Sequence, residues 1–142
     1  MVISPTFLSS DCVLCLGKGT IDYDAFVDLF EELSRVNGPL AGVSLFCDLR
    51  GCHSTLDFKS EVRITSYIQA HLPLLSGSRW AFFTDSMLIF GLARMGQILT
   101  SDLPFHVSVF QDPDTAANWL GWHGEIRQAL RRHFGVSSTT SS

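Results

Sequence analysis

The sequence predicts an α/β fold in which a mixed, mostly parallel sheet of four or five strands has helices packed on its faces. Two observations lead to this prediction. Short apolar segments alternate with longer segments of helical periodicity along most of the chain. The nearly unbroken apolar run at 40–49 is typical of a central strand that is covered on both faces. The alternation also requires crossovers between parallel strands, which are almost always right-handed.

Five apolar segments are predicted as strands because they are short and lie between turn residues. In chain order they cover residues 2–8, 12–16, 40–49, 79–84 and 105–110. The short gap between the first two favours an antiparallel hairpin, whereas the later gaps are long enough for a helical crossover. Loops are expected after the second strand at 17–20 and after the central strand at 50–55.

Four helices are predicted from apolar residues that recur at three- and four-residue steps. They are expected over residues 23–36, 56–71, 87–99 and 113–134. Each follows side chains that can cap a helix, namely Asp22, then Ser54 or Thr55, then Asp85 or Ser86, and finally Asp112. Pro113 suits the first position of the last helix, and Gly121 and Gly124 are expected to break or bend it.

The two middle helices are expected to have extensive apolar surfaces. The first of them is predicted to bury a broad face and to end at Pro73; this face consists of Phe58, Val62, Ile64, Tyr67, Ile68 and Leu72. The helix at 87–99 is apolar nearly all round, which predicts that it is well buried or lies at an interface.

Length and composition indicate one domain at 1–135, followed by a disordered polar tail at 136–142. The net charge of −4 argues against a nucleic-acid partner, because phosphate binding needs a surplus of Lys and Arg. There is no basic start typical of a secretory signal and no apolar run of about 20 residues, so a cytoplasmic protein is expected. The mean hydropathy of +0.22 and the 11 Phe predict apolar surface shared with a ligand, a protein partner or a second copy in a homodimer.

Three segments together carry a resemblance to a known family. They are the end of the central strand at 45–50, the strand at 79–85 and the closing segment at 109–120. In order and spacing they resemble the SpoIIAA-like family of small bacterial proteins, which is related in fold to STAS domains. The resemblance covers residues 2–120. It implies a non-enzymatic regulatory or binding domain, with members similar to lipid-carrier folds that hold apolar, lipid-like ligands.

The resemblance also implies an alternative function as a phosphorylation switch. In the anti-sigma-antagonist type of STAS domain, the phosphorylated serine lies in an Asp-Ser-Ser-Gly stretch after the central strand. The matching region here is 54–58, which departs from that pattern but places Ser54 and Thr55 near the equivalent position.

Polar side chains follow three of the predicted parallel strands, where ligands of open α/β sheets collect. The candidate ligand-binding or switch residues are Asp48, Arg50, Cys52, His53, Ser54, Thr55, Asp85 and Ser86. The competing interpretation is that Ser54, Thr55, Asp85 and Ser86 only cap helices.

The cysteines and histidines predict no catalytic residue, no metal site and no cofactor. Cys52 beside His53 suggests a thiol enzyme as a further alternative, but adjacent side chains rarely point at each other, so an exposed and inert thiol is expected. Cys12 and Cys15 have the spacing of a metal or redox pair, yet on a strand they point to opposite faces. All four cysteines are expected to be reduced.

The C-terminal helix combines aromatic and basic residues. Its candidate contacts with a membrane surface or a partner are Trp119, Trp122, Arg127 and Arg131. The favoured interpretation is that its apolar face packs on the sheet and that its cations suit the C-terminal end of a helix. Peripheral membrane contact is therefore an alternative and not the expectation.

Overall fold

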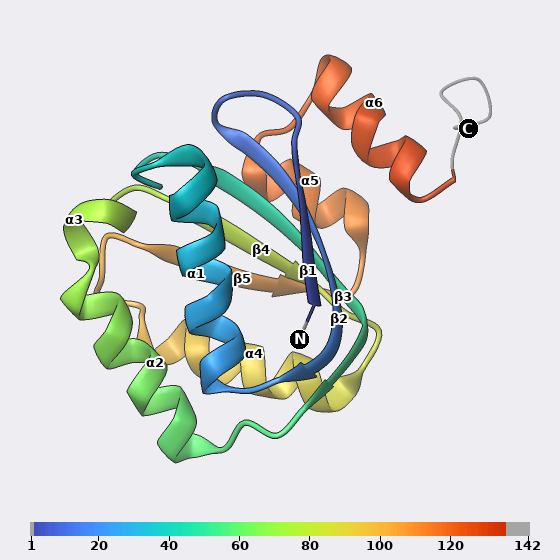
Figure 1. Cartoon of the computed structure of the whole chain (residues 1–142). Helices are drawn as coiled ribbons and strands as arrows, with labels where there is room; N and C mark the ends of the chain where they lie inside the picture. Colours follow the sequence, from blue (N-terminus) through green and yellow to red (C-terminus); the bar gives the residue numbers. More distant parts are fainter. Residues whose placement is uncertain (1, 136–142) are drawn as a thin grey trace.

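The computed structural model of the chain describes residues 2–135, so the tail expected at 136–142 lies outside the described residues. One sheet contains five strands in the order of the sequence (Figure 1). They are β1 (Val2–Phe7), β2 (Cys12–Ile21), β3 (Ser44–Ser54), β4 (Arg79–Phe83) and β5 (His106–Phe110). β1 pairs antiparallel with β2 and the other neighbours pair in parallel, which confirms the predicted hairpin and the mostly parallel sheet.

In the described part of the chain, six helices cover the two faces of the sheet. They are α1 (Tyr23–Asn37), α2 (Phe58–Ala70), α3 (Leu72–Leu75), α4 (Met87–Leu99), α5 (Pro113–Leu120) and α6 (Gly124–His133). The strand order follows the sequence, so successive right-handed crossovers put α1 to α4 on one face (Figure 1). We call this the crossover face. Within residues 2–135, only α5 and α6, which come after the last strand, cover the opposite face.

Aspartate or serine side chains cap the N-termini of α1, α2, α4 and α5. Asp22, Ser86 and Asp112 accept hydrogen bonds from backbone N–H groups of the first helical turn, which confirms three predicted caps. The prediction that Ser54 or Thr55 caps α2 was wrong. Asp57 caps this helix through Ser60 N at 2.8 Å, because the chain is still part of a strand at Ser54.

The central strand is longer than predicted and is shifted toward the C-terminus. Residues 40–43 form a turn, while the segment expected as a loop at 50–54 pairs with the second half of β2. Asp48 lies opposite Leu16 and Gly51 opposite Lys18, so β3 has one extra residue in this interval. Side chains along a regular strand point alternately to the two faces of the sheet, so Cys47 and Cys52, five residues apart, would point to opposite faces. Because of the bulge, both pack on the crossover face.

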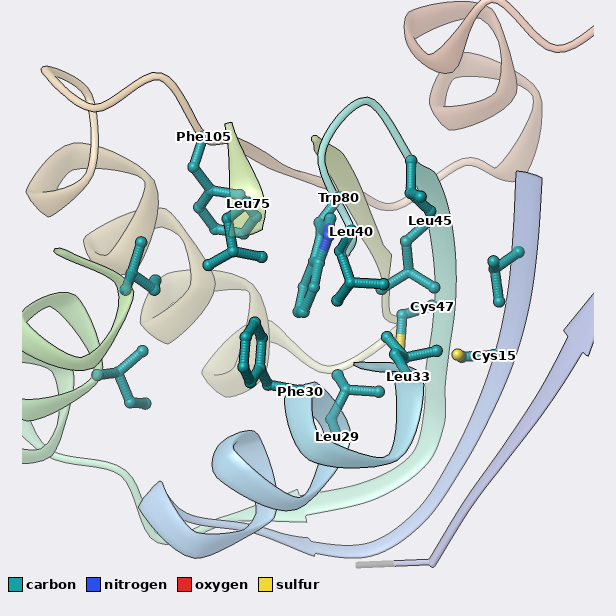
Figure 2. Close-up of a cluster of buried hydrophobic side chains, with 14 of the residues drawn as sticks. Cys15, Leu29, Phe30, Leu33, Leu40, Leu45, Cys47, Leu75, Trp80 and Phe105 are labelled. Atoms are coloured by element: carbon teal, nitrogen blue, oxygen red, sulfur yellow. The ribbon is translucent and has the colours of Figure 1, made fainter. Parts of the chain in front are cut away.

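The core under the crossover helices is built around Trp80 of β4 (Figure 2). Leu29 and Leu33 of α1 belong to the same buried cluster as Leu45 of β3 (Figure 2). The Trp80 indole N–H donates to Ser78 Oγ at 2.9 Å, and this hydroxyl donates to the Val43 carbonyl at 2.7 Å. The indole of Trp80 and the hydroxyl of Ser78 are thus both paired inside this core.

A second core lies under α5 and α6. Leu14, Phe46, Ala81 and Phe83 of the sheet pack there against the helical residues Ala116, Ala117, Leu120, Trp122 and Leu130. β3 is therefore covered on both faces, as its apolar run predicted. Gly121 has φ 74° and ends α5, so the predicted break between α5 and α6 is confirmed.

The buried face of α2 differs from the predicted one. Phe58 and Val62 are 61% and 40% exposed, whereas Glu61 is only 4% exposed. The helix ends at Ala70, and Pro73 lies inside the short helix α3 instead of ending a helix. Prolines are tolerated in a first helical turn because their missing N–H would have no partner there.

Of the two alternatives predicted for α4, that it is well buried or that it lies at an interface, the first is wrong and the second stays a prediction. Ile89 is its one fully buried residue, while Met87, Leu88 and Ile98 are more than 60% exposed. None of the helices within residues 2–135 has both the length and the apolar character needed to cross a membrane.

Replacing Leu45 tests whether β3 is the centre of the core. Leu45 is fully buried, so we expect Leu45→Ala to lower the free energy of unfolding by about 2–5 kcal/mol. Val36 of α1 is 51% exposed, and Val36→Ala as a control should change it by no more than about 0.5 kcal/mol. Urea denaturation measures both, and equal effects of the two substitutions would contradict a central β3.

Candidate binding cavity

A cavity of about 100 Å³ lies between the sheet and the crossover helices α1, α2 and α4. Most of its lining is aliphatic or aromatic. The helices contribute Phe26, Leu29, Ile64, Ile68, Ile89, Leu92 and Ala93, and the sheet contributes Ile21, Cys47, Leu49, Phe82 and Val107. We call this space the Glu61 cavity, after the one ionisable carboxyl group in its lining.

Glu61 is placed in the lining by the phase of α2. The cap at Asp57 starts the helix so that Glu61, Ile64 and Ile68 share the buried stripe. The Glu61 carboxylate reaches across to α4, where a β-carbon at Gly96 would lie 3.0 Å from Oε2. The absence of a side chain at Gly96 therefore leaves room for this carboxylate.

No hydrogen bond or ion pair joins the Glu61 carboxylate to another residue in the described part of the chain. Burial raises the pKa of this carboxyl group to about 7, because a charge is poorly solvated among apolar side chains. Near neutral pH both the ionised and the protonated forms are therefore populated.

The other polar side chains that line the cavity already have partners. Ser54 Oγ donates to the Ile21 carbonyl, Thr65 Oγ1 to the backbone carbonyl of Glu61, and Thr100 Oγ1 to the Gly96 carbonyl. These bonds turn the hydroxyls toward the backbone. The cavity thus presents an apolar wall with a single unpaired acidic group.

A second polar arrangement lies on the opposite face of the sheet, around Asp48 in the middle of β3. The Asp48 carboxylate is 1% exposed and accepts hydrogen bonds from both Nε and Nη2 of Arg50, at 3.0 and 2.9 Å. His133 Nε2 at the end of α6 lies 2.9 Å from Asp48 Oδ2. Burial alone would raise the pKa of Asp48, but the hydrogen bonds from Arg50 and His133 outweigh it and lower this pKa below its usual value.

Aromatic rings complete this arrangement. The Arg50 guanidinium lies 5.2 Å from the ring centre of Phe83 and 4.8 Å from that of Phe134. Each polar group is thus paired or stacked within the chain, and the arrangement joins α6 to β3. We interpret it as a structural contact and not as a binding site.

The structure divides the eight predicted ligand or switch residues among different places. Asp48 and Arg50 lie under α6, Cys52 faces the crossover helices, Ser54 lines the Glu61 cavity and Ser86 caps α4, while His53, Thr55 and Asp85 are exposed. They form no single cluster, because β3 continues six residues beyond Asp48 and carries a bulge. Ser54 is the one that the structure places at the cavity.

The expectation of an exposed thiol at Cys52 was wrong. This residue is 7% exposed and belongs to the crossover-face core. Burial raises its pKa, with the Asp48 charge adding to the effect, so the reactive thiolate is disfavoured. This is opposite to the activation that a thiol enzyme requires.

The remaining cysteines do not form an alternative site. The four thiols are free, which agrees with the expected reduced state. Among residues 2–135, no three His, Cys, Asp or Glu side chains are arranged to hold a metal ion.

The candidate contact residues of the C-terminal segment are largely used inside the molecule. Trp122 is 4% exposed and packs against Phe46, and the Arg79 guanidinium stacks on Trp119 at 4.4 Å. Arg127 binds Asn118, Asp114 and the Trp122 carbonyl. Arg131 is half-buried. The apolar face of α6 packs on the sheet, as the favoured interpretation predicted.

Glu61 gives the folded protein a defined pH dependence. The pKa of its carboxyl group rises from 4.5 to about 7 on folding. Between pH 4.5 and pH 7 this group is therefore protonated in the folded state and ionised in the unfolded state. Stability is therefore expected to fall as pH rises through this window, by on the order of 3 kcal/mol. Glu61→Gln should remove this decrease in urea denaturation measured from pH 4.5 to 8.

The exposed Glu125 of α6 supplies the matched control. Glu125→Gln should leave the pH dependence of unfolding as in the unmodified protein. If Glu61→Gln and the unmodified protein show the same slope, the carboxyl group is not buried as described.

Asp48 predicts the opposite pH response. Folding lowers the pKa of the Asp48 carboxyl group below its ordinary value of 3.8. The stabilisation of the folded state by ionised Asp48 is therefore complete above pH 3.8, and it is lost as the pH falls through the folded-state pKa. We expect Asp48→Asn to lower the free energy of unfolding by about 1–3 kcal/mol at pH 7, and by progressively less below about pH 4. The exposed pair of Glu32 and Arg35 provides a control, because Glu32→Gln should cost at most about 1 kcal/mol.

Comparisons with known proteins agree on the fold. No family model matches the sequence, and a search of curated proteins finds no match. Among solved structures, the chain is similar to an uncharacterized protein of the DUF3478 family with a SpoIIAA-like fold from Shewanella loihica PV-4. The TM-score is 0.53 with 15% identity, over 84% of this chain and 92% of that one.

The chain is also similar to the anti-sigma factor antagonist SpoIIAA in its unphosphorylated form. The TM-score is 0.50 with 12% identity, over 87% of this chain and 100% of that one. At such identities a structural likeness establishes the arrangement of the chain and not its activity. The five-stranded mixed sheet with helices on both faces therefore has the SpoIIAA-like fold that the sequence resemblance predicted.

Proposed function

We propose that the chain is a non-enzymatic binding and regulatory domain, which holds a small apolar molecule in the Glu61 cavity and contacts a protein partner through α2 and α4. The observation that carries this proposal is the cavity itself. Its wall is apolar, and every polar side chain in it except Glu61 is hydrogen-bonded. Apolar pockets with few polar groups are the usual form of small-molecule sites.

The volume of the cavity limits the ligand. About 100 Å³ is well below the roughly 300–1,000 Å³ of pockets for drug-sized ligands. An apolar cavity of about 150 Å³ can enclose benzene. We therefore propose a compact ligand of about four or five non-hydrogen atoms, which is smaller than the lipid-like molecule that the family resemblance suggested.

The surface of the same helices supports a role in binding a partner. α2 and α4, which line the cavity, carry the large exposed apolar side chains Phe58, Val62, Met87, Leu88 and Ile98. Such side chains are common at protein interfaces, including those between two copies of one chain. A ligand between α2 and α4 would set the spacing of the two helices and thereby the shape of this surface.

Thr55 is a second candidate for regulation, by phosphorylation. It is exposed and lies two residues before Asp57, the cap of α2, so a phosphate there would lie near a helix N-terminus. The Ser54 hydroxyl is less suitable, because it donates to the Ile21 carbonyl and accepts from Leu56 N–H. Phosphopeptide mapping of protein from its native cells tests this candidate.

Binding of a neutral apolar probe tests the main proposal. We expect isobutanol to shift the methyl NMR signals of Ile64 and Ile89, which line the cavity, and to raise the thermal midpoint in proportion to its occupancy. Ala93→Leu fills the cavity and should abolish both effects. Ala70→Leu places the same side chain on an exposed part of α2 and should preserve them.

Native mass spectrometry of the purified protein determines how many copies of the chain associate and whether a small molecule co-purifies with them. No methyl shift with isobutanol, or equal shifts in the Ala93→Leu variant, would contradict binding in the Glu61 cavity.

A further inference from the structure

We propose that the Glu61 cavity selects a small apolar amine, whose ammonium group pairs with the Glu61 carboxylate while its hydrocarbon part fills the apolar lining. This inference rests on the proposed function, since it names the chemical class of the ligand at the same site. It depends on the geometry of one side chain and on what its surroundings lack.

The first step of the argument is the isolation of the carboxylate. Glu61 is 4% exposed and lies on α2 opposite Gly96 of α4. Within the described residues its carboxylate has neither a hydrogen bond nor an ion pair. Buried carboxylates are normally paired, because an unpaired charge in an apolar site is strongly destabilising. An unpaired one at a cavity indicates that its partner comes from outside the chain.

The second step is the absence of a competing charge. No Lys, Arg or His side chain lines the cavity in the described part of the chain. Besides Glu61, the titratable group in the lining is the Cys47 thiol of β3, and burial raises its pKa so far that it stays neutral. A cation in the cavity would therefore face one negative charge and no positive one.

The third step excludes other head groups. An anionic ligand would bring a second negative charge beside Glu61, and like charges at a buried site repel strongly. A neutral alcohol can form one hydrogen bond but leaves the charge of the carboxylate unbalanced. Charge-assisted hydrogen bonds are about twice as strong as neutral ones, so an ammonium group is the best partner.

The size of the cavity selects the probes. Isobutylamine and isobutanol have the same hydrocarbon part and the same number of non-hydrogen atoms, and both suit a space of about 100 Å³. They differ in the charge of the head group, since the amine is protonated well above neutral pH. Comparing their dissociation constants by NMR titration therefore isolates the contribution of Glu61.

At pH 8 we expect isobutylamine to bind at least tenfold more tightly than isobutanol. Lowering the pH to 5.5 protonates Glu61, and with a pKa of about 7 the affinity for the amine should fall about thirtyfold. The affinity for isobutanol should change much less. Glu61→Gln should remove the preference for the amine and its pH dependence while it preserves isobutanol binding.

A pair of glycine variants on α4 provides the matched control. A β-carbon at Gly96 would lie 3.0 Å from Glu61 Oε2, whereas one at Gly91 meets nothing within 4 Å. Gly96→Ala should displace the carboxylate and weaken amine binding at least tenfold, and Gly91→Ala should leave it unchanged. This pair and the pH profile of the unmodified protein decide the matter even if Glu61→Gln does not fold.

The outcomes separate the two proposals. If isobutanol binds but isobutylamine binds no more tightly at pH 8, or if Glu61→Gln keeps the preference, the selection of an amine is overturned and the apolar site remains. If neither probe binds the unmodified protein, the proposed function fails together with it.

Discussion

The burial of β3 on both faces is the constraint that places the other elements of this fold. A strand of apolar residues in the middle of a parallel sheet needs helices above and below it. Three successive crossovers in one direction put α1 to α4 on one face only, so the chain after β5 must return across the other face as α5 and α6. Where β3 carries a charge, at Asp48, this returning segment and Arg50 supply its partners.

The two faces of the sheet treat a buried carboxylate in opposite ways. Asp48 is held ionised by Arg50 and His133, whereas Glu61 has no partner and its pKa rises toward neutrality. One arrangement ties α6 to the sheet, and the other leaves a buried carboxylate without a partner between α2 and α4. A local conflict that packing does not resolve is expected at functional sites, because function and not stability maintains it. The crossover face, with its unpaired Glu61 carboxylate, is therefore the face at which we propose binding.

The likeness to SpoIIAA-like structures and the cavity address different questions. The fold follows from strand order, helix placement and the two cores, which low sequence identity does not obscure. The chemistry depends on single side chains, and folds of this kind host many functions. Glu61, Gly96 and the exposed apolar residues of α2 and α4 therefore have to be judged by their own geometry.

The sequence by itself determined the order of the elements, the antiparallel start, the parallel centre and three of the four helix caps that were predicted. These features depend on local periodicity and on residue types at turns, so they can be seen within short windows. The length of β3 was not visible, because a strand that continues past Gly51 is stabilised by pairing with β2 and not by its own apolar pattern.

Only the tertiary structure decided which residues form the site. Phe58 and Val62 were predicted to be buried and Glu61 was not among the candidate residues, since the buried stripe of a helix is defined by the elements that it packs against and not by hydrophobicity alone. The one sequence signal was the spacing of Glu61 from Ile64 and Ile68 on α2. Whether that spacing points a carboxylate to water or into a cavity depends on α4, which lies some thirty residues away in the chain and beside it in space.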